Sequence, residues 1–234
     1  MTMTTDDAPQ SPTSANLAVV IAAAGRSVRF GSDKLAASLG GATVLERSVG
    51  ALRAALPTSP MVVVVDDDRV DHWRESLSSC EVIAGGPRRQ DSVLLGIDRA
   101  AELGSEIVAV HDGARPLIHP DDVIKVIDAL GGGAAAILCG GVSDTVKRID
   151  GDDVIVETID RDCLRLAQTP QVFRVAALRQ AWKTQDASRD FSDEAAILEA
   201  GGCEVRVVVA NHPNPKLTTL GDLELMRLMV GSTT

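Results

Sequence analysis

The most constraining feature of this chain is the alternation of short apolar runs with segments of helical periodicity. Five unbroken apolar runs have the length of strands covered on both faces: Leu17–Ala22, Met61–Val65, Ile107–Val110, Ala134–Cys139 and Val205–Val209. Three segments between them place apolar residues three and four apart, as amphipathic helices do: Val44–Leu56, Ser92–Leu103 and Asp122–Leu130. This order predicts a largely parallel sheet with helices on both faces, and ligand binding at the carboxyl ends of its strands. Asp121 is the predicted cap of the third helix.

One segment interrupts this rhythm. Asp144–Ile149 and Asp153–Thr158 are strand-like runs on either side of a hairpin-type turn. An isolated two-stranded arm is marginally stable, so we expect it to project from the body and to pack on a second copy of the chain. We predict one domain at about residues 17–231, with the arm at about 142–170. Residues 1–16 are acidic, rich in Thr, Ser and Pro and without a basic signal-peptide region, which predicts a disordered tail.

Composition excludes several functional classes. No stretch approaches the roughly 20 apolar residues that cross a bilayer, so we expect a cytoplasmic protein without membrane contact. The net charge of −10 and the absence of Tyr argue against a nucleic-acid surface. Four widely spaced cysteines, with no C-x-x-C pair and no His at ligand spacing, argue against a zinc site or disulfide framework and favour buried free thiols.

The first strand runs into a loop of small residues that ends at Lys34. Ala23, Ala24 and Gly25 allow backbone N–H groups to approach an anion, and Arg29 and Lys34 add positive charge. The loop is neither a Walker loop nor a dinucleotide-binding turn. An ordinary glycine-rich loop with exposed basic side chains explains it about equally well.

Two further loops follow other strands. Gly85 and Gly86 open a helix in which Ser92 is predicted either to cap the helix or to bond a base edge. Asp112, after a third strand, is placed to reach a metal ion or a ribose hydroxyl, because hard cations prefer oxygen ligands. His111 beside it is interpreted as structural.

Polar clusters elsewhere have simpler explanations when each is taken alone. A helix cap accounts for Ser192 and Asp193, and a solvated lysine accounts for Lys216. The run Asp66–Asp68 is similar to a metal-binding cluster, but its place between a strand and a helical pattern favours helix capping.

Taken together and in this order, the motifs resemble one family. They are A-A-G-x-x-x-R with a following Lys, G-G-x-x-R-x-x-S-V, H-D-x-A-R-P, D-T-x-K-R, D-R, T-P-Q-x-F, D-E-A and N-x-K-x-T. This set resembles 2-C-methyl-D-erythritol 4-phosphate cytidylyltransferase of the non-mevalonate isoprenoid pathway, over roughly Leu17 to Met229. The resemblance implies an α/β, Rossmann-like three-layer nucleotidyltransferase fold with a mostly parallel sheet and a projecting β-hairpin arm. It also implies transfer of CMP from CTP to the acceptor with release of pyrophosphate, a requirement for Mg²⁺ or another divalent cation, and a homodimer joined through the arm.

The resemblance also assigns roles to individual residues. The implied catalytic residues are Arg29, Lys34, Arg161 and Lys216. The implied nucleotide-binding residues are Ala23, Ala24, Gly25, Gly86, Ser92, Asp112 and Gly113, with Asp112 also the implied metal ligand. The implied acceptor-binding residues are Thr145, Arg161, Thr169, Ser192 and Lys216. In such dimers Thr145 and Arg161 can serve the pocket of the neighbouring subunit.

The chain departs from the family pattern at several positions. Ser27 replaces a usual glycine, Asp33 precedes Lys34 in a short loop, and Pro87 replaces an acidic residue. Three alternatives therefore stay open: a cytidylyltransferase for another polyol phosphate such as ribitol 5-phosphate, a nucleotidyltransferase for another base, and a weakly active CTP-binding paralogue. Retention of an acceptor clamp at Arg161 and Lys216 argues against the last of these.

Overall fold

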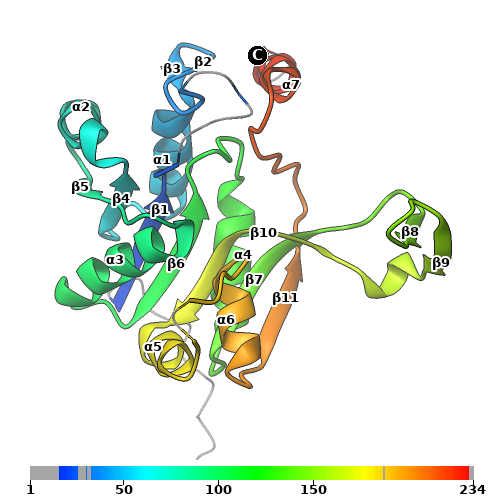
Figure 1. Ribbon diagram of the computed structural model, residues 1–234. Helices are drawn as coiled ribbons and strands as arrows, with labels where there is room; N and C mark the ends of the chain where they lie inside the picture. The colour runs from blue at the N-terminus through cyan, green and yellow to red at the C-terminus, as the bar shows by residue number, and fades with distance from the viewer. Residues whose placement is uncertain (1–15, 26–29, 31–32, 187, 232–234) are drawn as a thin grey trace, which may run out of the picture.

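The computed structural model describes residues 16–25, 30, 33–186 and 188–231. At its centre is a seven-stranded sheet with the order β11-β7-β10-β6-β1-β4-β5 (Figure 1). The strands are β1 (Leu17–Ala22), β4 (Met61–Val65), β5 (Glu81–Ala84), β6 (Ile107–Asp112), β7 (Ala135–Gly140), β10 (Leu166–Arg174) and β11 (Val205–Val209). All of them run in the same direction except β10, which is antiparallel to both β6 and β7. The predicted α/β architecture with a mostly parallel sheet is confirmed.

Helices cover both faces of the sheet because its strands present apolar side chains on both sides. The helices are α1 (Val44–Ala55), α2 (Val70–Ser76), α3 (Arg89–Glu102), α4 (Pro120–Leu130), α5 (Val175–Lys183), α6 (Glu194–Ala200) and α7 (Leu220–Gly231). In β1, Val19 and Ile21 join the apolar core that includes side chains of α1, α2, α4 and α7. The alternate residues Ala18 and Val20 join the core on the α3, α5 and α6 side. A small hairpin of β2 (Ser38–Leu39) and β3 (Ala42–Thr43) precedes α1.

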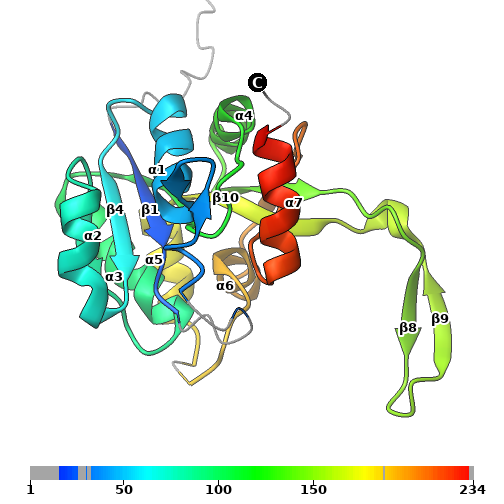
Figure 2. The same cartoon turned by 90° about the horizontal axis from the view of Figure 1, so that it is seen from above.

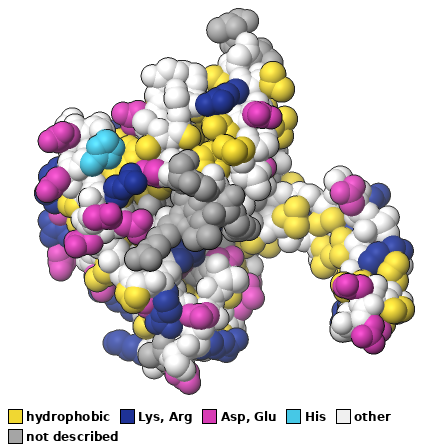
Figure 3. Space-filling view, turned by 45° about the horizontal axis from the view of Figure 1, so that its top comes forward, with side chains coloured by type: hydrophobic (Ala, Val, Ile, Leu, Met, Phe, Trp, Pro, Cys, Tyr) yellow, Lys and Arg dark blue, Asp and Glu magenta, His cyan; other side chains and the backbone are white. Residues whose placement is uncertain are grey.

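A two-stranded arm extends from the body between β7 and β10 (Figures 1 and 2). It consists of β8 (Val146–Ile149) and β9 (Ile155–Ile159), which pair antiparallel, followed by the 3₁₀ turn η3 (Arg161–Cys163). The predicted end of the arm at residue 170 falls within β10, where Leu166 already pairs with Gly140 of β7. The arm and its junction with the body carry large exposed apolar side chains (Figure 3): Ile149, Val154, Ile155, Val156 and Leu166.

The observed element boundaries correct several predictions. The predicted cap Asp121 is wrong, because the N-cap of α4 is His119, whose ring accepts a hydrogen bond from the Asp121 N–H. Pro120 takes the first helical position, where its fixed φ suits the first turn and its missing N–H costs nothing. Strands β5 and β10 were not predicted from the sequence. Strand β5 is only four residues long, and β10 contains Pro170 and polar residues instead of an unbroken apolar run.

Several predictions concern single residues or the chain ends. Residues 1–15 of the predicted tail lie outside the described residues, whereas the backbone oxygen of Asn16 accepts a hydrogen bond from the Glu106 N–H at 3.0 Å. The cysteines are free, but only Cys139 is fully buried and Cys163 is exposed, so the expectation of buried thiols is wrong for Cys163. Across the described part of the chain, every helix is too short or too polar to traverse a lipid bilayer.

Helix α3 packs closely on β1 and β4 at Gly96. A Cβ atom there would lie 2.5 Å from the Val20 side chain and 2.8 Å from that of Val64. We therefore expect Gly96→Ala to lower the free energy of unfolding by about 1–3 kcal/mol through overpacking, measured by urea denaturation.

Gly50 in α1 provides the matched control, because it is exposed and nothing lies within 4 Å of its missing Cβ. Gly50→Ala should raise the free energy of unfolding by roughly 0.5–1 kcal/mol, since alanine is the better helix former. Equal stabilisation by both substitutions would contradict the close contact of α3 with the sheet.

Candidate active site

The loops that follow β1, β4 and β5 enclose a cleft at the carboxyl edge of the sheet. Its volume is about 1280 Å³. Five residues predicted to bind the nucleotide line it: Ala23, Ala24, Gly25, Gly86 and Ser92. Parallel strands place their carboxyl ends at one edge, so residues distant in sequence meet here.

Ser92 organises the glycine loop on one side of this cleft. Its hydroxyl accepts a hydrogen bond from the Gly86 N–H at 3.1 Å and lies 3.2 Å from the Gly86 oxygen. The predicted helix-capping role of Ser92 is wrong, because α3 already begins at Arg89 and the Asp91 carboxylate accepts the Arg88 N–H. A contact between Ser92 and a base edge stays a prediction.

Aspartates form the opposite side of the cleft. The Asp66 carboxylate accepts a hydrogen bond from the Gly25 N–H at 3.0 Å. Asp66 precedes the 3₁₀ turn η2 (Asp67–Arg69) but makes no side-chain capping bond, so the capping prediction is wrong for this residue. Asp33, one of the departures from the family pattern, forms an ion pair with Arg69 and thereby ties the loop before Lys34 to η2. Arg29 and Ser27 lie outside the described residues.

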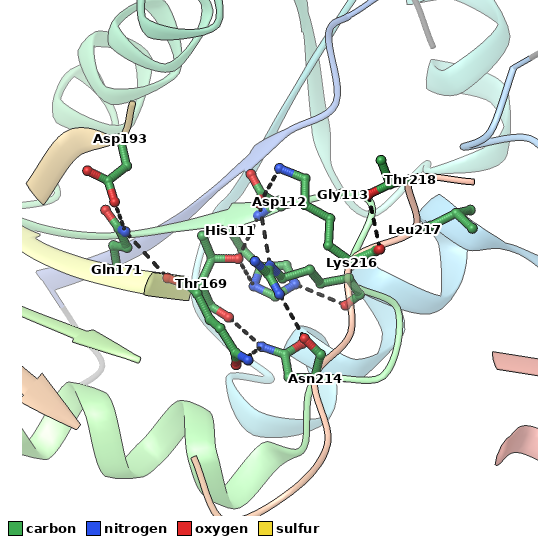
Figure 4. A network of polar contacts seen from close by, with 12 residues as sticks. His111, Asp112, Gly113, Thr169, Gln171, Asp193, Asn214, Lys216, Leu217 and Thr218 are labelled. Atoms are coloured by element: carbon green, nitrogen blue, oxygen red, sulfur yellow. Dashed lines mark hydrogen bonds and ion pairs between the residues drawn. The ribbon is translucent and has the colours of Figure 1, made fainter. Parts of the chain in front are cut away.

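Asp112, the last residue of β6, lies at the centre of a charged cluster (Figure 4). Its carboxylate contacts Lys216 Nζ at 2.9 Å, Arg115 Nε at 3.4 Å and Arg89 Nη2 at 3.4 Å. Arg89 also donates to both oxygens of Glu194, at 2.8 and 3.2 Å. We call these five residues the Asp112 cluster.

Burial and the neighbouring charges act in opposite directions on the pKa values of the two carboxylates of the Asp112 cluster. Burial by itself raises the pKa of Asp112, but the positive charges of Lys216 and Arg89 outweigh burial and hold this pKa well below its usual range. For Glu194, burial outweighs the charge of Arg89 and raises the pKa. With both carboxylates ionised, three cations face two anions, so the cluster carries one excess positive charge and suits an anionic ligand.

A hydrogen-bonded chain behind Asp112 holds its backbone in place. The Asp112 N–H donates to the Thr169 hydroxyl at 3.0 Å, and this hydroxyl lies 3.2 Å from His111 Nδ1. His111 Nε2 lies 3.2 Å from the Arg115 oxygen, which assigns the ring proton to Nε2. Burial lowers the pKa of His111 to about 4, so the ring is neutral at pH 7. The structural interpretation of His111 is confirmed. The buried Thr169 hydroxyl contacts Asp112 and His111, and its contact with an acceptor stays a prediction.

The remaining motifs join the same network (Figure 4). Asn214 Nδ2 donates to the Thr169 oxygen at 2.8 Å, and Arg115 Nη1 donates to the Asn214 oxygen at 2.7 Å. Gln171 Nε2 donates to Asp193 at 2.9 Å, and Asp193 caps α6 through the Ala196 N–H, as predicted. The motifs T-P-Q, D-E-A and N-x-K are therefore parts of one structural unit.

Lys34 and Lys216 lie at the same edge of the sheet. Lys34 Nζ donates to the backbone oxygen of Leu217, the residue after Lys216, at 3.2 Å. Gly113 links this region to β1, because its N–H donates to the Ala22 oxygen at 2.9 Å and a Cβ there would lie 2.9 Å from Leu45.

Four predicted acceptor-binding residues are not part of the Asp112 cluster in this chain: Thr145, Arg161, Thr169 and Ser192. Thr145 and Arg161 are exposed on the arm, where Arg161 donates to the Ser143 oxygen. Ser192 is exposed immediately before α6. Conversely, the site predictions omitted Arg89, Arg115 and Glu194, although each lies within a motif. The available signal was the charged position that each of these motifs contains: the Arg of G-G-x-x-R, the Arg of H-D-x-A-R-P and the Glu of D-E-A.

Known proteins resemble this chain in both sequence and fold. Residues 17–232 match the family model described as 2-C-methyl-D-erythritol 4-phosphate cytidylyltransferase. The chain belongs to this family. A family member of that name from Pelotomaculum thermopropionicum is 35% identical over 227 residues, which cover 92% of this chain and 94% of the relative. A bifunctional enzyme IspD/IspF from Rhodopseudomonas palustris is 36% identical over 212 residues, but the match covers 53% of that relative. The chain thus spans about half the length of the bifunctional relatives that it matches.

Solved structures of the family share the fold. A 4-diphosphocytidyl-2C-methyl-D-erythritol synthase from Anaerococcus prevotii superimposes with a TM-score of 0.81 at 26% identity, covering 92% of this chain and 96% of that one. The 2-C-methyl-D-erythritol 4-phosphate cytidylyltransferase of Thermus thermophilus gives a TM-score of 0.76 at 28% identity, covering 92% and 98%.

The buried neutral ring of His111 predicts a pH dependence of stability. Its pKa is about 4 in the folded chain against its ordinary value of 6.5, so the unfolded chain binds more protons between these values and stability falls as the pH decreases. We expect this residue to account for a loss of roughly 2 kcal/mol in the free energy of unfolding between about pH 7 and about pH 5.

The measurement compares urea denaturation at the two pH values in the wild type, His111→Gln and His72→Gln. His72 is exposed on α2 and serves as the control. The pH-dependent loss should shrink in His111→Gln alone. An unchanged loss in that variant would show that other groups cause the pH dependence.

Proposed function

We propose that this chain transfers CMP from CTP to 2-C-methyl-D-erythritol 4-phosphate and releases pyrophosphate. The observation that carries the proposal is the Asp112 cluster, which supplies excess positive charge next to a cleft with small residues on one side and aspartates on the other. Membership in the cytidylyltransferase family supports the same reaction. The single-domain boundaries at residues 17–231 and the cytoplasmic location stay predictions.

The chemistry explains why lysines and arginines predominate in the proposed site. The acceptor phosphate is already anionic and needs no general base, so the barrier arises from bringing two polyanions together and from charge that grows on the α-phosphate. Asp112 orients Lys216, which is half exposed and available to an acceptor phosphate. Lys34, held at the Leu217 oxygen, is proposed to stabilise the α-phosphate together with Arg29.

The residues present fit a hard divalent cation such as Mg²⁺. Asp112 is kept ionised, and the contact of its Oδ1 with Arg89 is long at 3.4 Å, which leaves that oxygen suited to a metal ion. Mg²⁺ in nucleotide sites is commonly held by one or two carboxylates together with substrate phosphates. The bound cation would neutralise phosphate charge. We propose Asp112 as its protein ligand.

The two lysines provide a test of the reaction. We expect Lys34→Ala and Lys216→Ala to stay folded and to lose about a hundredfold or more in turnover, since one preorganised charge contributes on the order of 3 kcal/mol to the transition state. The assay is pyrophosphate release from CTP with methylerythritol phosphate, without acceptor, and with ribitol 5-phosphate.

Lys125→Ala is the matched control, because Lys125 Nζ also donates to a backbone oxygen, that of Val209, at 2.8 Å. Normal rates in both test variants would remove the lysines from the mechanism. Pyrophosphate release with ribitol 5-phosphate but not with methylerythritol phosphate would identify ribitol 5-phosphate as the acceptor. No release with either acceptor would overturn the proposed function.

We also propose that the arm joins two copies of the chain and that Thr145 and Arg161 complete the pocket of the partner subunit. The exposed apolar residues of the arm support this, because such a patch requires a covering partner. In a two-fold dimer each arm would reach the other body.

A mixing experiment tests this arrangement. Arg161→Ala and Lys216→Ala should each be inactive alone, whereas a mixture should regain part of the activity, because one pocket of each mixed dimer combines two intact halves. The reference is the wild type mixed with Lys216→Ala, and the mass in solution is measured by light scattering. A monomeric mass, or no recovery on mixing, would contradict the proposal.

A further inference from the structure

Outside the Asp112 cluster, a second set of ligand-type side chains meets where α4 begins and β11 ends. His119 is the N-cap of α4, Asp121 lies in its first turn, and His212 follows β11. One ligand atom from each of the three residues lies within 4.8 Å of the others. The two imidazole rings are stacked, with centroids 3.7 Å apart and planes inclined by 14°. We call these three residues the His119 cluster.

We propose that the His119 cluster binds a divalent transition metal ion such as Zn²⁺, separately from the hard cation of the transfer reaction.

The buried carboxylate of Asp122 orients His212 for this role. His212 Nδ1 lies 3.1 Å from Asp122 Oδ2, and the backbone N–H groups of Asn211 and His212 donate to the same carboxylate at 2.9 and 3.0 Å. A carboxylate beside Nδ1 favours the tautomer that carries its proton there and leaves a lone pair on Nε2. Metal-binding histidines typically donate their other ring N–H to a carboxylate in this way.

His119 and Asp121 already lie near the separation that a metal ion requires. His119 Nδ1 accepts the Asp121 N–H at 3.3 Å, so this nitrogen carries a lone pair, and a bound ion would replace this hydrogen bond. The same nitrogen lies 3.6 Å from Asp121 Oδ2. Two ligands at about 2.0 Å from a tetrahedral Zn²⁺ would lie roughly 3.3 Å apart. Because an ion lies in the plane of each imidazole that binds it, the two stacked and partly exposed rings would turn apart to close the site.

The donor set determines which ion is expected. Two imidazole nitrogens and one carboxylate suit Zn²⁺, Ni²⁺, Co²⁺ or Cu²⁺, whereas Mg²⁺ favours oxygen ligands. The side chains of His119, Asp121 and His212 are 42%, 77% and 38% exposed, so an ion reaches them from solvent and a water molecule can complete the coordination. The net charge of −10 on the chain also favours a cation.

Metal binding here would connect two of the segments that contribute to the Asp112 cluster. α4 follows the turn that carries Asp112 and Arg115, and His212 shortly precedes Asn214 and Lys216. Because the unfolded chain does not hold the three ligands together, the ion would stabilise the folded state and raise Tm.

The experiment uses the full-length chain without a histidine tag, stripped of metal and equilibrated with Zn²⁺ in a large excess of Mg²⁺. Elemental analysis of the bound zinc and the Tm are measured. We expect one zinc ion per chain and a higher Tm for the wild type. The variant His119→Ala/His212→Ala should lose at least tenfold in zinc affinity together with the Tm increase, whereas His72→Ala should keep both. Asp122→Asn should weaken binding by about 10–100-fold while all three ligands remain.

The outcomes separate this site from other sources of zinc binding. Equal zinc binding by the wild type and the double variant would overturn the proposal and place the ion at cysteines or at the cleft aspartates. No binding by the wild type would overturn it as well. If the double variant does not fold, His119→Gln at its half-exposed position gives the same comparison.

Discussion

A buried, ionised carboxylate at the end of β6 determines how the candidate site is built. Taking a charge out of water is costly unless it is paired and hydrogen-bonded, and Asp112 meets this requirement through Lys216, Arg89 and Arg115. These cations come from the end of the β11–α7 connection, the start of α3 and the loop after β6. Compensating one carboxylate therefore fixes the positions of three separate segments.

The fold was largely predictable because the period of apolar residues reports directly which face of an element is buried. Leu17–Ala22 and Met61–Val65 were predicted with their observed bounds. Strand β10 was missed because its pairing depends on β6 and β7, which lie on either side of it in space, and its Gln-Thr-Pro-Gln segment has no apolar period. The cap of α4 was misplaced because Pro120 moves the helix start toward the N-terminus.

For the site, the sequence identified the motifs that take part, but it did not identify which residue each side chain contacts. Thr169 and Ser92 carry hydroxyls of the kind that bind substrates, yet both hydroxyls are engaged by neighbouring backbone groups. The partner of Thr169, Asp112, is 57 residues away in the sequence, and the partner of Ser92, Gly86, lies in a loop whose conformation the spacing alone does not encode. Arg89 was passed over for a related reason: its importance comes from Glu194 and Asp112, which are remote from it in the sequence.

The two proposed ion sites differ in donor chemistry although they share two segments, the loop after β6 and the β11–α7 connection. In the Asp112 cluster every carboxylate oxygen faces cationic nitrogen, so only a hard cation accompanied by phosphate charge can compete there. In the His119 cluster the proposed nitrogen donors are His212 Nε2, whose ring faces Asp122 through Nδ1, and His119 Nδ1, where an ion would replace the hydrogen bond from the Asp121 N–H. Since imidazole nitrogen discriminates strongly against Mg²⁺, an ion at α4 would not displace the cation of the reaction. Its influence on the reaction would pass through the short backbone segment from His212 to Lys216.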